Sequence, residues 1–144
     1  MQNDYLKASG RVEIVVIRAD GTEEREEFDN LIVTAGKSHI AARVSSAPPT
    51  GMGYIAIGTG ATAPAAGDTT LQTELDRNSA TAIANSNAVQ FSSTWAPGDG
   101  TGALTEAGIF NAASAGTMLS RVTFPVKNKD AGDTFIINWT ITFS

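Results

Sequence analysis

Apolar and polar residues alternate along several stretches of this chain, and the clearest alternation lies at its C-terminal end. Between Thr134 and Phe143 every second residue is large and apolar. This apolar face consists of Phe135, Ile137, Trp139, Ile141 and Phe143. A period of two with aromatic residues on one face is typical of a half-buried antiparallel strand. We therefore expect Phe135, Ile137 and Trp139 to be structural core residues.

Shorter segments of the same kind, separated by turn residues, predict further strands. These segments are residues 11–18, 23–30, 54–58, 80–84, 88–94, 104–111 and 117–126. The dense charge at 23–27 indicates an exposed edge strand. Because the strand faces are apolar on one side only, the pattern excludes a doubly wound parallel sheet. It favours a mainly all-β fold, an antiparallel β-sandwich or barrel of about eight strands.

One short helical insertion is expected in residues 31–44, where Ile40, Ala41 and Val44 are spaced to face a core. Residues 69–77 are predicted to form a helical turn or two. The total length of 144 residues suits one domain. We expect a polar N-terminal arm at residues 1–8 and a single β-sandwich domain at residues 9–144.

The composition narrows the classes of partner. The net charge is −5 and the ten basic residues are scattered, which argues against a nucleic-acid partner. No apolar run approaches the ~18–20 residues of a membrane span, and the first ten residues lack a signal-peptide centre. We expect synthesis in a bacterial cytoplasm and no membrane partner. Only 17% of residues are charged, which indicates a surface covered by protein partners or, alternatively, a merely neutral β-domain.

Candidate catalytic and metal-binding groups are few. The chain has no cysteine, and His39 is its only histidine. A Ser-His-Asp triad would have to use His39, but no Gly-x-Ser-x-Gly elbow presents a nucleophile. The glycine-rich residues 58–64 lack the Gly-Lys-Ser/Thr ending of a phosphate loop. We therefore expect no enzyme activity, no metal and no cofactor, and we expect His39 to lie on a helix surface or at an interface.

Loops and termini are the segments most expected to contact partners. The segments concerned are the arm, residues 45–53 and residues 96–102. Trp95 precedes the last of these and is either a core residue or an exposed anchor for a neighbour. The candidate contact residues are Asp4, Tyr5, Leu6, Pro48, Pro49, Met52, Trp95, Pro97 and Asp99.

Three stretches carry a distinctive combination of motifs. They read YIAIGTGATAPAAGDTTLQTELDR at 54–77, LTEAGIFNAASAGTMLSRVTF at 104–124 and DTFIINWTITF at 133–143. With NLIVTAGKSHIAARV at 30–44, they resemble a recurrent family of small virion structural proteins of tailed bacteriophages. The likeness covers most of the chain. It implies a head accessory or a tail- or fibre-associated module, and it carries over no active-site residue.

Glu106 is a charge within a predicted apolar strand. Such a charge usually finds a basic or backbone partner, and we expect Arg77 or Arg121 to be its mate. Glu106 and Arg121 are therefore predicted to have structural roles.

The resemblance thus implies a virion protein, and we expect most specifically a capsid decoration or cement protein that stabilises the head by binding major capsid subunits. We expect a homo-oligomer, a dimer or a trimer. The alternative is a tail, tail-fibre or baseplate-associated structural protein. A remote alternative from another class is a carbohydrate-binding module or a small lyase, because sandwich folds host both.

Overall fold

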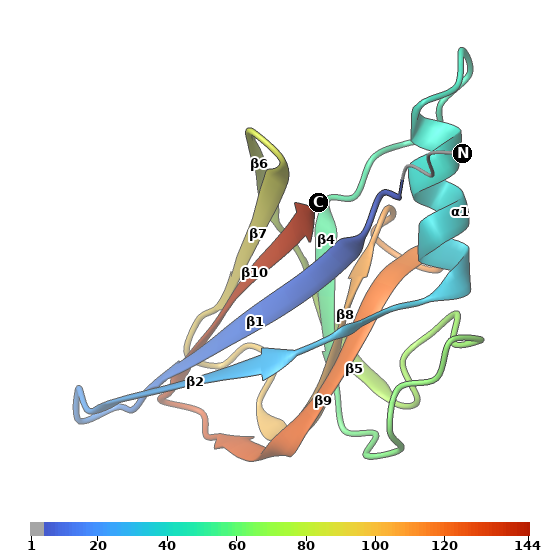
Figure 1. Ribbon diagram of the computed structural model, residues 1–144. Helices are drawn as coiled ribbons and strands as arrows, with labels where there is room; N and C mark the ends of the chain where they lie inside the picture. The colour runs from blue at the N-terminus through green and yellow to red at the C-terminus, as the bar shows by residue number, and fades with distance from the viewer. Residues whose placement is uncertain (1–4) are drawn as a thin grey trace.

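The chain folds into two antiparallel five-stranded sheets that face each other, as seen in a computed structural model that describes residues 5–144 (Figure 1). In chain order the elements are β1 (Ala8–Ile17), β2 (Glu23–Asp29), β3 (Leu31–Ile32), α1 (Thr34–Arg43), β4 (Tyr54–Gly58), β5 (Glu74–Ser79), β6 (Thr81–Asn85), β7 (Ala88–Trp95), β8 (Gly102–Phe110), β9 (Met118–Lys129) and β10 (Thr134–Phe143). The predicted mainly-β sandwich with one short helix is confirmed.

The strand orders are β2-β1-β10-β7-β6 in the first sheet and β3-β9-β8-β4-β5 in the second. The chain passes from one sheet to the other at two sheet edges. Asn30 separates β2 from β3, and Ala80 separates β5 from β6. Such crossings close the sides of the sandwich, because the edge strand of one sheet leads within one residue to the edge strand of the other.

The main core lies between the sheets, where the alternation of β10 places it. Phe135, Ile137 and Trp139 are 0% exposed, as predicted. Trp95 is also 0% exposed, and its ring meets that of Phe135 edge-on with centroids 6.0 Å apart. Aromatic pairs prefer such T-shaped geometry. Because its side chain is fully buried, Trp95 is a core residue and the exposed-anchor alternative is wrong.

The second sheet also buries part of its other face. Ala56, Phe110 and Met118 form a small second cluster there with Val33 and Leu71. Leu71 belongs to the loop between β4 and β5, which therefore covers this face of the sheet. That coverage explains why β4 reads as a continuously apolar strand.

The prediction of helical turns at residues 69–77 is wrong, because this segment ends in the strand β5. Arg77 pairs with Ala56 of β4 across an antiparallel ladder. The free sheet edge thus decides the conformation, since strand formation depends on context more than on local preference. The short strand β3 was also not predicted, which brings the number of strands among residues 5–144 to ten.

The helix is shorter than predicted and presents a different face. Gly36 lies so close to the Leu119 carbonyl of β9 that a Cβ at this position would approach its oxygen to 2.1 Å. This contact turns Gly36, His39 and Ile40 toward the protein. Ala41 and Val44 consequently face solvent, and Val44 is 86% exposed, so the prediction that both face a core is wrong.

The predicted N-terminal arm is partly built into the sheet. Lys7 exchanges two backbone hydrogen bonds with Ser144, of 2.7 and 2.8 Å, and Ala8 pairs with Phe143. Backbone pairing of this kind fixes residues 7 and 8, which leaves Tyr5 and Leu6 as the described residues that extend beyond the sheet.

Candidate functional site

A buried ion pair joins Glu106 of β8 to Arg121 of β9. Glu106 is 0% exposed and Arg121 is 2% exposed. The Arg121 guanidinium donates to Glu106 Oε1 from Nη2 at 3.0 Å and to Asp68 Oδ2 from Nη1 at 3.1 Å. The predicted pairing of Glu106 with Arg121 is confirmed, whereas Arg77 pairs with Glu74 instead, at 2.7 Å.

The Glu106 carboxylate also holds the loop between β4 and β5. The backbone N–H groups of Gly60 and Thr73 donate to its Oε2, both at 2.7 Å, and that of Gln72 donates to its Oε1 at 2.8 Å. Burial by itself would raise the pKa of Glu106, but these three backbone bonds and the Arg121 guanidinium outweigh it and lower the pKa. The carboxylate is therefore held ionised as a structural anchor.

Two glycines of the IGTG motif are required by this anchor. A Cβ on Gly58 would come within 2.3 Å of the Thr73 carbonyl oxygen, and one on Gly60 within 2.5 Å of the Glu106 carboxylate. The motifs IGTG and TEAGIF therefore describe one structural unit, in which a loop folds over a sheet around a single carboxylate. This is a physical reason for these residues that involves no catalysis.

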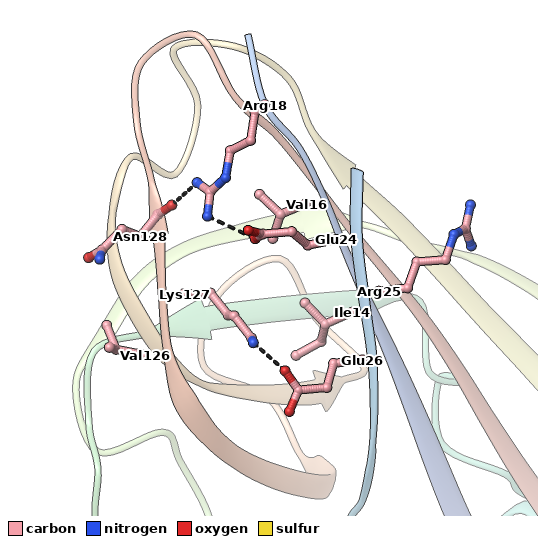
Figure 2. Close-up of a pocket in the computed structure, with 9 residues that line it drawn as sticks. All are labelled: Ile14, Val16, Arg18, Glu24, Arg25, Glu26, Val126, Lys127 and Asn128. Carbon is pink, nitrogen blue, oxygen red and sulfur yellow. Dashed lines mark hydrogen bonds and ion pairs between the residues drawn. The ribbon is translucent and has the colours of Figure 1, made fainter. Parts of the chain in front are cut away.

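A polar pocket of about 390 Å³ lies between β2 and the C-terminal part of β9 (Figure 2). Its floor is formed by Ile14 and Val16. Arg18 reaches Glu24 at 2.9 Å and Lys127 reaches Glu26, so charges at its rim are engaged with one another. The Lys127–Glu26 pair ties β2 to β9 across the sandwich. Arg18 makes a second link, because it pairs with Glu24 of β2 and donates a hydrogen bond to the Asn128 carbonyl of β9. These contacts give the pocket a structural explanation.

The strongest candidate for a functional surface is apolar and lies beside α1. Three large side chains are exposed there: Leu6 at 76%, Tyr5 at 83% and Val44 at 86%. They line a hollow of about 790 Å³. We call this surface the arm–helix patch, and its residues are Tyr5, Leu6, Lys7, Ala8, Lys37, Ile40, Ala41, Val44 and Phe143. Contiguous exposed apolar patches of this kind mark interaction sites.

The structure divides the predicted contact residues between two ends of the molecule. Tyr5 and Leu6 line the hollow beside α1 together with Phe143, the last residue of β10. Met52 lies in the loop between α1 and β4. It is half-buried, packs on the core and lines a hollow together with Arg43 of α1. Pro97 and Asp99 are exposed but follow Trp95, which pairs with Phe135 at the opposite end of β10.

The remaining candidate residues differ in how far they are exposed. Pro48 is exposed and Pro49 is half-buried, with its carbonyl accepting a hydrogen bond from Arg43 at 2.5 Å. Asp4 lies outside the described residues. His39 is only 6% exposed, so its prediction as a helix-surface residue is wrong. Burial and the nearby Arg43 charge lower the pKa of His39, which favours the neutral imidazole.

Within residues 5–144, no three His, Asp or Glu side chains are arranged to hold a metal ion. In the same part of the chain, no helix has the length and apolar character needed to cross a membrane. Comparisons with family models, with curated proteins and with solved structures gave no match to this chain.

Sequence reasoning identified Tyr5 and Leu6 but missed the helical half of the patch. Ala41 and Val44 have the spacing of a buried face, and only the contact of Gly36 with β9 reveals which side of the helix is covered. The charge pattern is the one signal in the sequence that sets this segment apart. Between Asp29 and Asp68 the chain has no acidic residue, but it has the basic residues Lys37 and Arg43 on α1.

Proposed function

We propose that this protein is a structural subunit of a tailed-bacteriophage particle, a capsid decoration protein that stabilises the head by binding major capsid subunits through the arm–helix patch. The observation that carries the proposal is the clustering of Tyr5, Leu6 and Val44, each more than three-quarters exposed, in one hollow. Soluble chains seldom leave such side chains together in water unless a partner covers them.

The patch has the size and chemistry of an interface centre. Burying a Leu or Val side chain completely contributes roughly 1.5–3 kcal/mol. Leu6 and Val44 together would therefore supply roughly 3–6 kcal/mol before the general costs of association are subtracted. This is a substantial part of the binding energy of a micromolar complex, which is about 8 kcal/mol.

The charge around the patch favours a partner with carboxylates. Lys7 and Lys37 both line the hollow, and Arg43 lies on the same helix. A capsid surface with an apolar centre and acidic rim would be complementary to it, because opposite charges at a rim steer encounter and fix the orientation of docking.

The resemblance of residues 54–77, 104–124 and 133–143 to small virion proteins supports the same role. Many of these matched residues are interior ones that build the sandwich and its Glu106-anchored loop. These residues form a stable scaffold. In this proposal, binding to the capsid is carried out by the surface that the scaffold presents.

The test is the binding of purified variants to particles that lack the protein. Val44→Asp places a charge in the patch, and Val126→Asp places the same charge on a 53% exposed valine far along the chain on β9. We expect Val44→Asp to weaken binding by roughly 10-fold to 100-fold, which corresponds to the loss of one buried apolar side chain. Val126→Asp should bind like the unmodified protein. Equal binding of the two variants would overturn the role of the patch.

The tail or baseplate alternative is separated from the head assignment by where the bound protein lies. A decoration protein binds in many copies over the shell, whereas a tail component binds in few copies at one end. Quantitative mass spectrometry of purified particles distinguishes the two, and absence of the protein from the particle would exclude both.

A further inference from the structure

The four edge strands of the two sheets differ in how they avoid pairing with other chains. The β2 edge contains Glu23, Glu24, Arg25, Glu26 and Glu27, and β5 contains charges at Glu74, Asp76 and Arg77. The β3 edge has only two residues and continues directly toward α1. Charge and shortness are the usual means by which proteins block strand addition at a sheet edge.

The β6 edge has neither means. Its sequence, Thr-Ala-Ile-Ala-Asn at 81–85, is uncharged, and all five residues are exposed. Ile83 is 65% exposed. The absence of charge extends well beyond the strand, because no charged residue occurs between Arg77 and Asp99. Figure 1 shows β6 at the margin of its sheet, in a hairpin with β7.

The backbone of β6 has its free hydrogen-bonding groups at two positions. Ser86 has a φ of 57° and, with Asn87, forms a two-residue turn, so Asn85 and Ala88 make the hydrogen-bonded pair that closes the hairpin. Since this pattern alternates along an antiparallel ladder, Ile83 also directs its N–H and C=O toward β7. Ala82 and Ala84 therefore direct theirs away from the sheet.

We propose that β6 pairs with β6 of a second copy of this chain, in an antiparallel arrangement with its two-fold axis at Ile83. Ala82 of each copy then faces Ala84 of the other, and the two residues exchange both backbone hydrogen bonds. Ile83 meets Ile83 in the non-hydrogen-bonded position, where opposing Cα atoms are about 4.5 Å apart. The two five-stranded sheets become one continuous sheet across the dimer.

A second copy is the occupant that the sequence of the edge favours. Two-fold pairing brings each residue opposite its mirror position, so any charge near the axis would meet a like charge. The residues from Asn78 to Gly98 contain none. The strand is also nearly palindromic in size, with small alanines on both sides of one isoleucine, so that the same side chains fit in both directions. This proposal does not depend on a role in a virion.

Cross-linking tests the register, and it benefits from a chain without cysteine. Ile83→Cys places two thiols opposite each other at the axis, within the usual Cα separation of a disulfide. Thr81→Cys is the matched control on the same strand and face, because its two copies would be about four residues, roughly 13 Å, apart along the strand. We expect rapid covalent dimer formation by the Ile83 variant under mild oxidation and little by the Thr81 variant. Equal cross-linking of both would overturn the register.

Sedimentation equilibrium tests the association itself. The unmodified chain, of 14.9 kDa, should approach twice that mass with increasing concentration. Ile83→Lys should raise the dimer dissociation constant by roughly tenfold or more, because like charges directly opposite each other destabilise a strand pair. Val126→Lys, at the 53% exposed position on β9, should leave the constant unchanged. A chain that stays monomeric at its highest soluble concentration, or an association that Ile83→Lys does not weaken, would overturn the proposal.

Discussion

Replacing Glu106 by Gln tests whether one carboxylate holds the β4–β5 loop on the sheet. The substitution keeps the shape of the side chain and removes its charge and one acceptor oxygen. In the native protein, Oε2 accepts from Gly60 and Thr73, while Oε1 accepts from Gln72 and Arg121. An amide can offer its oxygen to only one of these two sets. Its NH₂ group then faces the donors of the other set.

The magnitude follows from these contacts. At least two buried donors lose their acceptor, and each such loss costs about 1–3 kcal/mol. Removing one partner of a buried ion pair costs about 3–5 kcal/mol in total. Asp68 still neutralises part of the Arg121 charge at 3.1 Å, which places our expectation at about 3–4 kcal/mol. For a chain of this size, that loss lowers the melting temperature by roughly 10 °C.

The assay is reversible denaturant unfolding followed by tryptophan fluorescence, since Trp95 and Trp139 are both in the core. Glu27→Gln is the matched control, because Glu27 has a 52% exposed side chain paired with Arg11 on the surface. Exposed pairs of this kind contribute about 0–1 kcal/mol. If Glu106→Gln cost no more than Glu27→Gln, the structural assignment of the carboxylate would be refuted.

Two further predictions concern acid sensitivity and helix packing. Burial opposes ionisation of Glu106, but its hydrogen bonds from three backbone N–H groups and from Arg121 lower the folded pKa below the ordinary value of 4.5. The stabilisation by this carboxylate is therefore complete above pH 4.5 and is lost as the pH falls toward and through the folded pKa. The free energy of unfolding should therefore decline more steeply below pH 4.5 in the unmodified protein than in Glu106→Gln, and parallel acid titrations would contradict this. Gly36→Ala should destabilise by roughly 1–3 kcal/mol, because its Cβ would meet the Leu119 carbonyl at 2.1 Å, whereas Gly67→Ala, with open space around it, serves as control. Thermal unfolding of the two variants measures the difference, and equal melting temperatures would show that α1 does not pack as described.

The sandwich was predictable because its strands carry their own signal. In β10 every second residue is apolar; four of these residues, Phe135, Ile137, Trp139 and Ile141, are buried, and the last, Phe143, is half-buried. The two predicted segments 80–84 and 88–94 also correspond to β6 and β7, which pair with each other and are joined by the turn at Ser86 and Asn87. These features depend on local alternation and turn chemistry, which a sequence records directly.

The features that were missed depend on contacts between distant segments. β5 forms a strand because the β4 edge is available to it, although the spacing of Leu71 and Leu75 suits a helix. Val44 is exposed because Gly36 turns the helix toward β9. The sequence allows two positions for Trp95, and its contact with the Phe135 ring places it in the core. In each case the residue can be identified in the sequence, but a contact with a distant segment decides whether it is buried and which element it joins.

The candidate surface was half predictable for the same reason. Exposed termini such as Tyr5 and Leu6 are expected to contact partners. Their juxtaposition with Val44 follows from the pairing of Ala8 with Phe143, which brings the N-terminal residues beside the helix. No local pattern in the sequence predicts that pairing, because its two residues lie near opposite ends of the chain.

The most direct test of the proposed function is an image reconstruction of the purified particle at a resolution that separates helices from strands. We expect many symmetrically placed copies on the head, each oriented with α1 and the arm–helix patch against the major capsid protein. Copies with the patch exposed to solvent, or a particle that contains no copy of this chain, would contradict the claim that this surface is where the protein works.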